Sequence, residues 1–357
     1  MSIERFNENP ILTPASVKAT ADHLEVAAVI NPAAVQVGGD TILLVRVCER
    51  AREQDDEHLS SVIFDSAEQR VKIVKAPKDH PELVEVSANS YRYKGRTLLT
   101  SMSHLRVARS SDGTHFRFDA KPAIFPSNPY EAFGCEEARI TFLDGWYYIT
   151  YAAVSDRGVV TALARTNDFE QFHKLGILLP PNQRDAYLFP RKVRGMFVCR
   201  ERPARSELNM PCVWTAYSPD LFSWGRYHMT LSPRGDMWDE SFVGGGAPPV
   251  RIEQGWLEVY NGVDRHGKCS LGVIISELEY PEQVLWRSPH PLLGPAEPCE
   301  NHGLRPGSVF CNGMVAREGG KLSLYYGAGG STVATATTSA EELISLARAS
   351  EPATAGK

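Results

Sequence analysis

The chain has 357 residues, of which 43% are hydrophobic and 23% are charged, and its formal net charge is −5. This composition is typical of an ordinary globular protein that is large enough to bury a substantial core. A mildly acidic chain without a basic patch is repelled by phosphate backbones, so we expect no nucleic-acid partner. We also expect no membrane span and no signal peptide, because no run of about 18 apolar residues occurs and the N-terminus is charged.

The cysteines are odd in number and scattered, and no two of them have CxxC spacing. They are Cys48, Cys135, Cys199, Cys212, Cys269, Cys299 and Cys311. This pattern argues against a disulfide framework and against a zinc site, and it favours a reducing, cytoplasmic location. No metal is expected.

A strand, a glycine turn and a second strand recur along the chain, which is the pattern of a β-hairpin. The copies lie at 33–47, 90–102, 139–152, 191–201, 249–262 and 314–327. A second signal follows most of them: a strand of small residues, then a polar turn that ends in an apolar residue. Its copies lie at 107–116, 163–172, 216–224, 273–284 and 334–343.

A four-stranded unit repeated in this way is typical of a propeller blade. The second signal has five copies, and the extra hairpin near Gly95 belongs to an insertion in or beside the first blade, covering roughly 51–100. Helical periodicity is nearly confined to EELISLARAS at 341–350. The sequence therefore predicts an all-β, five-bladed β-propeller that spans 1–357 as a single domain with this insertion.

Ligands of propellers bind on the central axis, where the innermost strands converge. Polar residues stand just ahead of the apolar strands at comparable positions in successive repeats. They are Asn31, Glu136, Glu137, Arg139, Arg184, Asp185, Glu240 and the segment around Ser308. Any one of them alone is more often a solvated loop residue, but their repetition at one end of the structure predicts a site there.

The chain resembles glycoside hydrolase family 130, the mannoside phosphorylases and mannosidases with a five-bladed propeller. The resemblance runs from about Asn31 to Leu343 and rests on ordered motifs, among them INPAAV, LLVRVCER, SHLRVARSSDG, GCEEARI, RDAYLFP, ERP, GGGAPP and YYGA. It implies that a small mannose-containing oligosaccharide is the partner of this chain.

The resemblance also implies roles for particular residues. Family members usually read Glu-Asp-Pro-Arg where this chain reads Glu136-Glu137-Ala138-Arg139, so Glu137 matches the proton donor that glycoside cleavage requires. The resemblance also implies that residues at positions matching the family's sugar-binding positions contact the sugar. They are Asn31, Arg46, His104, Glu136, Arg184, Asp185 and Arg202. Arg139 could hold a sugar hydroxyl or a neighbouring carboxylate, and a structural salt bridge is the equal alternative. For His104 a role in stabilising a turn is the equal alternative.

Phosphorylases of this family bind phosphate with a Lys and a His where this chain has Arg184 and Glu201. Arg184 could hold phosphate, but a carboxylate at Glu201 would repel it by about 1 to 4 kcal/mol. A carboxylate there would suit the general base of an inverting glycosidase. Glu240, just before the GGGAPP turn, is a second candidate for the base, and Phe242 stands where many phosphorylases have a basic residue.

The sequence therefore favours an inverting β-mannosidase that hydrolyses short β-mannosides, β-1,2-linked for preference and β-1,4-linked as the other case, without a cofactor. Two alternatives stay open. One is a mannoside phosphorylase with inorganic phosphate as co-substrate and Arg184 as its main ligand. The other is a catalytically silent propeller that binds carbohydrate or protein. The chain could form a homo-oligomer, and the 51–100 insertion could contribute to that interface or be a solvated flap.

Overall fold

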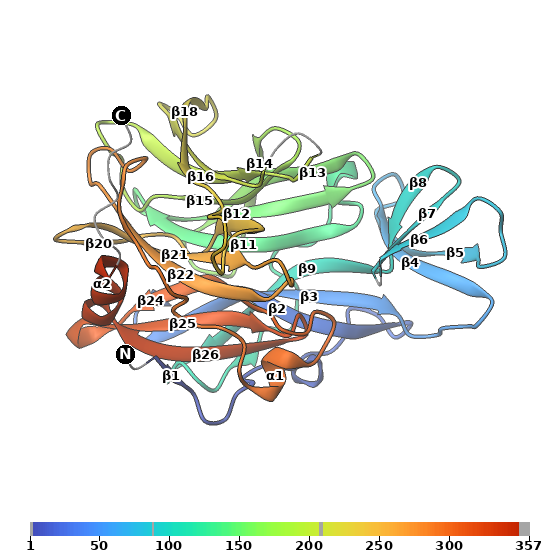
Figure 1. Ribbon diagram of the computed structural model, residues 1–357. Helices are drawn as coiled ribbons and strands as arrows, with labels where there is room; N and C mark the ends of the chain where they lie inside the picture. Colours follow the sequence, from blue (N-terminus) through green and yellow to red (C-terminus); the bar gives the residue numbers. More distant parts are fainter. Residues whose placement is uncertain (1–2, 88, 207–209, 350–357) are drawn as a thin grey trace.

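The structure is a computed structural model that describes residues 3–87, 89–206 and 210–349. Strands dominate these residues, and the all-β class is confirmed (Figure 1). The described helical segments are short: η1 (Pro14–Ser16), η2 (Pro129–Glu131), α1 (Pro298–Asn301), η3 (Glu318–Gly320) and α2 (Ala340–Arg348). Helix α2 coincides with the helical segment expected at 341–350, whose last residue lies outside the described ranges. No helix in these ranges is long and apolar enough to cross a membrane.

The described strands include five successive antiparallel units of four strands each. The first contains β2 (Leu24–Val37), β3 (Asp40–Ala51), β9 (Ser101–Ser110) and β10 (Arg117–Phe118). The second contains β11 (Gly134–Leu143), β12 (Trp146–Ser155), β13 (Gly158–Thr166) and β14 (His173–Leu179). The third contains β15 (Gln183–Leu188), β16 (Phe197–Pro203), β17 (Val213–Ser218) and β18 (Gly225–Leu231).

The fourth unit contains β19 (Phe242–Gly245), β21 (Gly255–Val263), β22 (Cys269–Ser276) and β23 (Val284–Arg287), with β20 (Val250–Ile252) paired to β21 at its side. The fifth contains β24 (Val309–Ala316), β25 (Lys321–Ala328) and β26 (Thr332–Ser339). Its fourth strand is β1 (Glu4–Arg5), which comes from the N-terminus and pairs with β26 through Glu4 and Thr337. The two ends of the chain therefore build one unit.

Apolar clusters fill the spaces between consecutive units, and a further cluster lies between the fifth unit and the first. Pairs that share a cluster are Ile42 with Ile149, Leu163 with Leu188, Tyr187 with Trp256, Val259 with Leu324, and Val29 with Val333. The strand pairings themselves do not close the units into a ring. One parallel pairing, Gly134 with Ser103, joins the first two units into an eight-stranded sheet. The five-bladed propeller therefore stays a prediction.

Two small sheets lie in the chain between β3 and β9, which are direct partners along their length. The first pairs β4 (His58–Asp65) with β5 (Arg70–Pro77), and the second contains β6 (Leu83–Ser87), β7 (Ser90–Tyr93) and β8 (Arg96–Leu99). Figure 1 shows β4 to β8 projecting together from one side of the five units. The sequence interval that they occupy lies within 51–100.

Candidate active site

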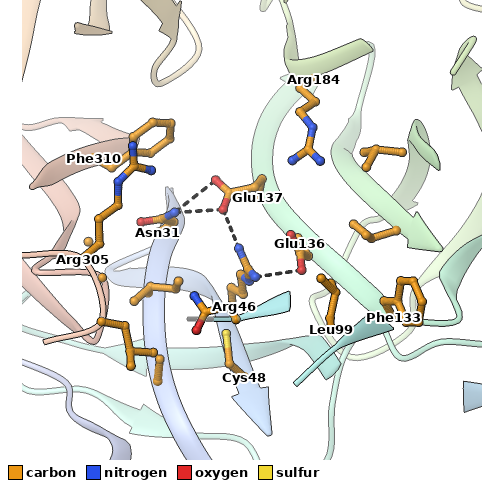
Figure 2. Close-up of a pocket in the computed structure, with 18 of the residues that line it drawn as sticks. Asn31, Arg46, Cys48, Leu99, Phe133, Glu136, Glu137, Arg184, Arg305 and Phe310 are labelled. Carbon is orange, nitrogen blue, oxygen red and sulfur yellow. Dashed lines mark hydrogen bonds and ion pairs between the residues drawn. The ribbon is translucent and has the colours of Figure 1, made fainter. Parts of the chain in front are cut away.

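A cavity of about 690 Å³ opens where the first strands of several units meet. This volume lies within the range of about 300–1,000 Å³ that is usual for small-molecule sites. Most of the expected site residues line it: Asn31, Arg46, Glu136, Glu137, Arg184, Asp185 and Arg202. Figure 2 shows how Asn31, Arg46, Glu136, Glu137 and Arg184 lie around it.

The same backbone irregularity carries polar side chains into this region from four units. The pairing register shifts between Ile30 and Ala33 in β2, Glu136 and Arg139 in β11, Arg184 and Tyr187 in β15, and Cys311 and Gly313 in β24. At three of these irregularities a residue other than glycine has a positive φ: 48° at Asn31, 54° at Glu137 and 52° at Asp185. Bulges re-aim side chains beside functional sites, and backbone strain of this kind persists where the surroundings hold it.

Glu137 lies at the centre of the hydrogen-bond network of the cavity. Its Oε1 accepts from Nδ2 of Asn31 at 2.9 Å and from Nη1 of Arg46 at 2.8 Å, and its Oε2 accepts from Nδ2 of Asn312 at 3.3 Å. These donors come from β2, β3 and β24. Because three strands fix one carboxyl group, its position depends on the assembly of the first, second and fifth units.

Arg46 binds both carboxylates of the GCEEARI motif. Its Nη2 donates to Oε1 of Glu136 at 2.7 Å while its Nη1 donates to Glu137, and its Nε donates to Oγ of Ser103 at 3.0 Å. The planar guanidinium suits such a bridging role. Arg46 therefore lies in the site and holds the two acids apart, whereas Arg50 pairs with Glu25 at the surface.

Asp185 forms a second ion pair in the cavity. Nε of Arg202 donates to its Oδ2 at 2.6 Å, and the Arg202 guanidinium lies 4.6 Å from the centre of the Phe242 ring. Burial by itself would raise the pKa of Asp185, but the positive charges of Arg202 and Arg139 lower it below its usual value. Asp185 is therefore held as a carboxylate, and most of the charge of Arg202 is compensated.

Two cavity arginines differ from these paired ones. The side chains of Arg184 and Arg305 line the cavity but form no direct hydrogen bond or ion pair with any described residue, although the charge of Arg184 helps to lower the pKa of Asp185. In Figure 2 Arg184 lies above Glu137 and Arg305 lies to its left, beside Phe310. Each guanidinium could therefore donate hydrogen bonds to an anion in the cavity.

Of the roles expected for Arg139, the structure favours the structural one, because Arg139 is 1% exposed and does not line the cavity. Its Nη1 donates to the carbonyl of Glu137 at 2.9 Å, its Nη2 to the carbonyl of Gly245 at 2.8 Å and its Nε to that of Gly246 at 3.1 Å. Asp185 lies 3.5 Å from Nη2. Arg139 is therefore a structural residue behind the cavity that ties β11 to the turn after β19.

The side chain of His104 points away from the cavity, and the reason is the geometry of the strand. Successive side chains point to opposite faces of a strand. Ser103, which contacts Arg46, lies on the cavity face, so His104 points the other way. His104 is fully buried, with Nε2 3.4 Å from Glu49. His104 lies outside the cavity lining, which favours the structural alternative, and a contact with sugar stays a prediction.

The expected base Glu201 does not line the cavity either. It is 3% exposed and follows Arg200 and precedes Arg202 on β16, so it shares the opposite strand face with Cys199. Its Oε2 atom has no hydrogen-bond partner among the described residues. Burial raises the pKa of Glu201 to about 7, although Arg202 opposes the rise. The repulsion expected between Glu201 and a bound phosphate therefore loses its geometric basis.

Glu240, the second candidate for the base, is engaged outside the cavity. Its Oε1 accepts from Nε of Arg265 at 2.6 Å, and its Oε2 accepts from Nη2 of the same guanidinium at 2.7 Å. Arg265 in turn pairs with Asp236 at the surface. Neither glutamate proposed as a base is therefore among the described residues that line the cavity.

Several residues that line the cavity or contact Glu137 were not singled out by the sequence analysis, although Asn312 belongs to the segment around Ser308 that it marked. Asn312 lies one repeat away from Asn31 at the same kind of bulge, and its polar side chain inside the apolar segment SVFCNG was the available signal. Arg305 comes from an irregular loop without a periodic signal. Asn89, Thr97 and Leu99 reach the cavity from the insertion, which the sequence alone could not place.

The chain is similar to proteins of known activity. The family model of glycoside hydrolase family 130, described as beta-1,4-mannooligosaccharide phosphorylase, matches residues 88–349. A beta-1,2-mannobiose phosphorylase of Listeria innocua is 33% identical over 341 residues, which cover 94% of this chain and 95% of that protein. A 1,2-beta-oligomannan phosphorylase of a Thermoanaerobacter strain is 31% identical over 63% of this chain and 75% of its own length. A crystal structure of the Listeria innocua beta-1,2-mannobiose phosphorylase in complex with beta-1,2-mannobiose has a TM-score of 0.94 at 32% identity, covering 98% of this chain and 100% of that one.

These findings contradict the prediction that the protein is a hydrolase. The similar proteins of known activity are named phosphorylases, at identities of 31% and 33%. The error came from Glu201, whose motif position suggested a carboxylate beside the anomeric carbon. Alternation along β16 instead turns this side chain away from the cavity.

Proposed function

Because the chain belongs to glycoside hydrolase family 130, we propose that it is a phosphorylase of short β-mannosides, with β-1,2-mannobiose as the substrate. In this reaction inorganic phosphate replaces the reducing-end sugar. The high similarity to a beta-1,2-mannobiose phosphorylase along almost the whole chain supports this choice of linkage.

The observation that carries the proposal is a pair of arginines without a direct carboxylate contact. Arg46 and Arg202 form ion pairs with Glu136, Glu137 and Asp185, whereas Arg184 and Arg305 form none with a described residue. Asp185 acts on Arg184 only through its charge, and it already pairs directly with Arg202. A phosphate dianion would supply the missing negative charge and accept several charge-assisted hydrogen bonds. A hydrolase, whose nucleophile is neutral water, would have no such use for two free guanidinium groups.

The reaction needs one acid and one anion on opposite sides of the anomeric carbon. A phosphate oxygen forms the new bond to that carbon while the bond to the leaving sugar oxygen breaks. Glu137 is the residue that supplies the proton that the leaving oxygen takes up. Single displacement inverts the configuration, so a β-mannoside gives α-mannose 1-phosphate and a free sugar.

The proposal also covers the fold, the cellular location and the oligomeric state of the protein. The apolar cluster between the first and fifth units supports a closed five-bladed propeller, and the direct pairing of β3 with β9 supports one domain with an insertion near 51–100. The cytoplasmic location that the scattered cysteines favour and the homo-oligomer stay predictions.

Product analysis tests the proposed reaction. Purified protein is incubated with β-1,2-mannobiose and, separately, with β-1,4-mannobiose, each with and without inorganic phosphate. Mannose is then resolved from mannose 1-phosphate. We expect mannose 1-phosphate from the β-1,2-linked sugar, and only when phosphate is present. Release of two mannose molecules at a rate independent of phosphate would contradict the proposal.

A further inference from the structure

The insertion between β3 and β9 contributes directly to the cavity. Asn89, Thr97 and Leu99 of the β6–β8 sheet and Ser101, where the chain returns to β9, are among the residues that line it. The lining also includes Ser155, the last residue of β12, and Asp156 in the turn that follows it. One wall of the cavity is therefore built from a segment that the five repeated units do not need for their own strand pairing.

This wall is anchored by a buried core. Along β8, Thr97 and Leu99 alternate with Leu98, so they occupy the opposite face of the strand. Leu98 is 8% exposed and Tyr91 is 1% exposed, and both pack in one cluster with Phe133 and Val154 of the second unit or its approach. Oγ of Ser61 donates to the Tyr91 hydroxyl at 2.8 Å, which ties the β4–β5 sheet to the same core. A solvated flap would lack such a core.

A further contact closes the rim of the same wall. Arg96, at the start of β8, forms an ion pair with Asp156, which lies in the turn after β12. Exposed pairs of this kind contribute little stability, but this one lies at the edge of the cavity and joins the insertion to the unit that carries Glu137.

The wall differs in chemistry from the rest of the cavity. Around Glu137 the lining is charged, whereas Leu99, Phe133, Val154 and Val159 form an apolar surface with Asn89 and Thr97 as polar points. Asp156, which is charged and also belongs to this lining, is paired with Arg96 at the rim. Such a mixture of apolar surface and a few hydrogen-bonding groups suits a neutral sugar ring. In the view of Figure 2, Leu99 and Phe133 lie below Glu137, whereas Arg184 lies above it.

We propose that the β6–β8 sheet forms the binding surface for the leaving sugar, so that this insertion determines which sugars the enzyme accepts beyond the transferred mannosyl unit. The inference rests on the proposed function, because an inverting displacement places the phosphate and the leaving sugar on opposite sides of the anomeric carbon. With the anion at Arg184, which Figure 2 shows on the opposite side of Glu137 from Leu99, the leaving sugar extends toward Leu99.

Binding measurements in the absence of phosphate test the wall separately from the reaction. Mannose, β-1,2-mannobiose and β-1,2-mannotriose are titrated into the wild type, Leu99→Ala, Thr97→Phe and Val84→Ala by calorimetry. Thr97 is exposed, so Thr97→Phe fills the cavity without disturbing the core even if Leu99→Ala folds poorly. Val84 is 55% exposed on β6 and does not line the cavity, so Val84→Ala is the matched control.

We expect Leu99→Ala and Thr97→Phe each to weaken the binding of mannobiose and mannotriose about 10-fold, while the affinity for mannose and the behaviour of Val84→Ala stay those of the wild type. Equal affinities for mannobiose in the wild type and in Thr97→Phe would overturn the proposal. So would a wild type that binds mannose and mannobiose equally, or that binds none of the three sugars. The product assay on the wild type reports the proposed reaction independently. If it fails while the affinities change as expected, the wall stands and the phosphorylase does not.

Discussion

Asn31 and Gly327 lie so close that no side chain fits between them. A β carbon added to Gly327 would lie 2.1 Å from Oδ1 of Asn31, which is far inside contact distance. Gly327 belongs to β25 of the fifth unit, whereas Asn31 belongs to β2 of the first. Because Asn31 donates to Glu137, this close approach connects the packing of two units to the position of the proposed acid.

We therefore predict that Gly327→Ala displaces Asn31 and lowers kcat/KM for mannobiose about 10²-fold, since misplacing a catalytic group by about 1 Å can cost that much. Steady-state kinetics with phosphate measures the effect. Gly225→Ala is the matched control, because a β carbon at Gly225 meets nothing within 4 Å. Equal losses in the two variants would contradict the connection to Asn31.

Arg184 should control the affinity for phosphate. Arg184→Ala removes a donor of charge-assisted hydrogen bonds, which are worth about 1.5–3 kcal/mol each, so we expect KM for phosphate to rise about 10-fold or more. The KM for mannobiose should change much less. The control is Arg251→Ala, an exposed arginine on β20 that does not line the cavity. If KM for phosphate stays at its wild-type value, Arg184 is not an anion ligand.

Glu137→Gln should leave sugar binding intact while removing the proton donor. The amide keeps an oxygen that can accept from Asn31 or Arg46 but cannot supply the proton that the leaving sugar needs. We expect kcat to fall about 10²- to 10⁴-fold, with mannobiose affinity by calorimetry close to that of the wild type. A variant that retains most of its kcat would exclude Glu137 as the acid.

Glu201 should affect stability and its pH dependence, and leave turnover in place. Its folded-state pKa of about 7 lies above the usual value of 4.5 for a glutamate, so the folded protein binds the proton more tightly than the unfolded chain does. At low pH the carboxyl of Glu201 is protonated and neutral, so its burial costs little. As the pH rises from about 4.5 to 7 the charged form is disfavoured in the folded protein, and the free energy of unfolding falls by at most about 3 kcal/mol.

Glu201→Gln removes this titration. Relative to the wild type, the variant should therefore gain stability as the pH rises from about 4 to about 8, a range that includes the whole window, measured by urea unfolding at each pH. Its phosphorolysis rate should remain near that of the wild type. A stability difference that does not vary with pH would show that Glu201 titrates normally.

Local patterns were sufficient for the class of fold and for much of the site. Strand alternation and glycine turns indicate the hairpins, and polar residues at repeated positions identify Asn31, Glu137 and Asp185, because a repeated unit places equivalent residues at one end. The same repetition could have identified Asn312. The direction of a side chain was harder to predict. His104 and Glu201 lie next to cavity residues in the sequence, but a strand sends neighbouring side chains to opposite faces.

The sequence by itself determined the all-β architecture, the family and the carboxylate pair of Glu136 and Glu137, since these depend on residue type and on short-range order. Tertiary structure decided which charges are compensated. Arg46 and Arg202 meet carboxylates carried by other strands, whereas Arg184 and Arg305 meet none among the described residues. Net charge at a site is a sum over residues that are distant in the chain. Only the packing of the units against one another, and of the insertion against the second unit, brings those residues within the few ångströms over which charge and shape select a ligand.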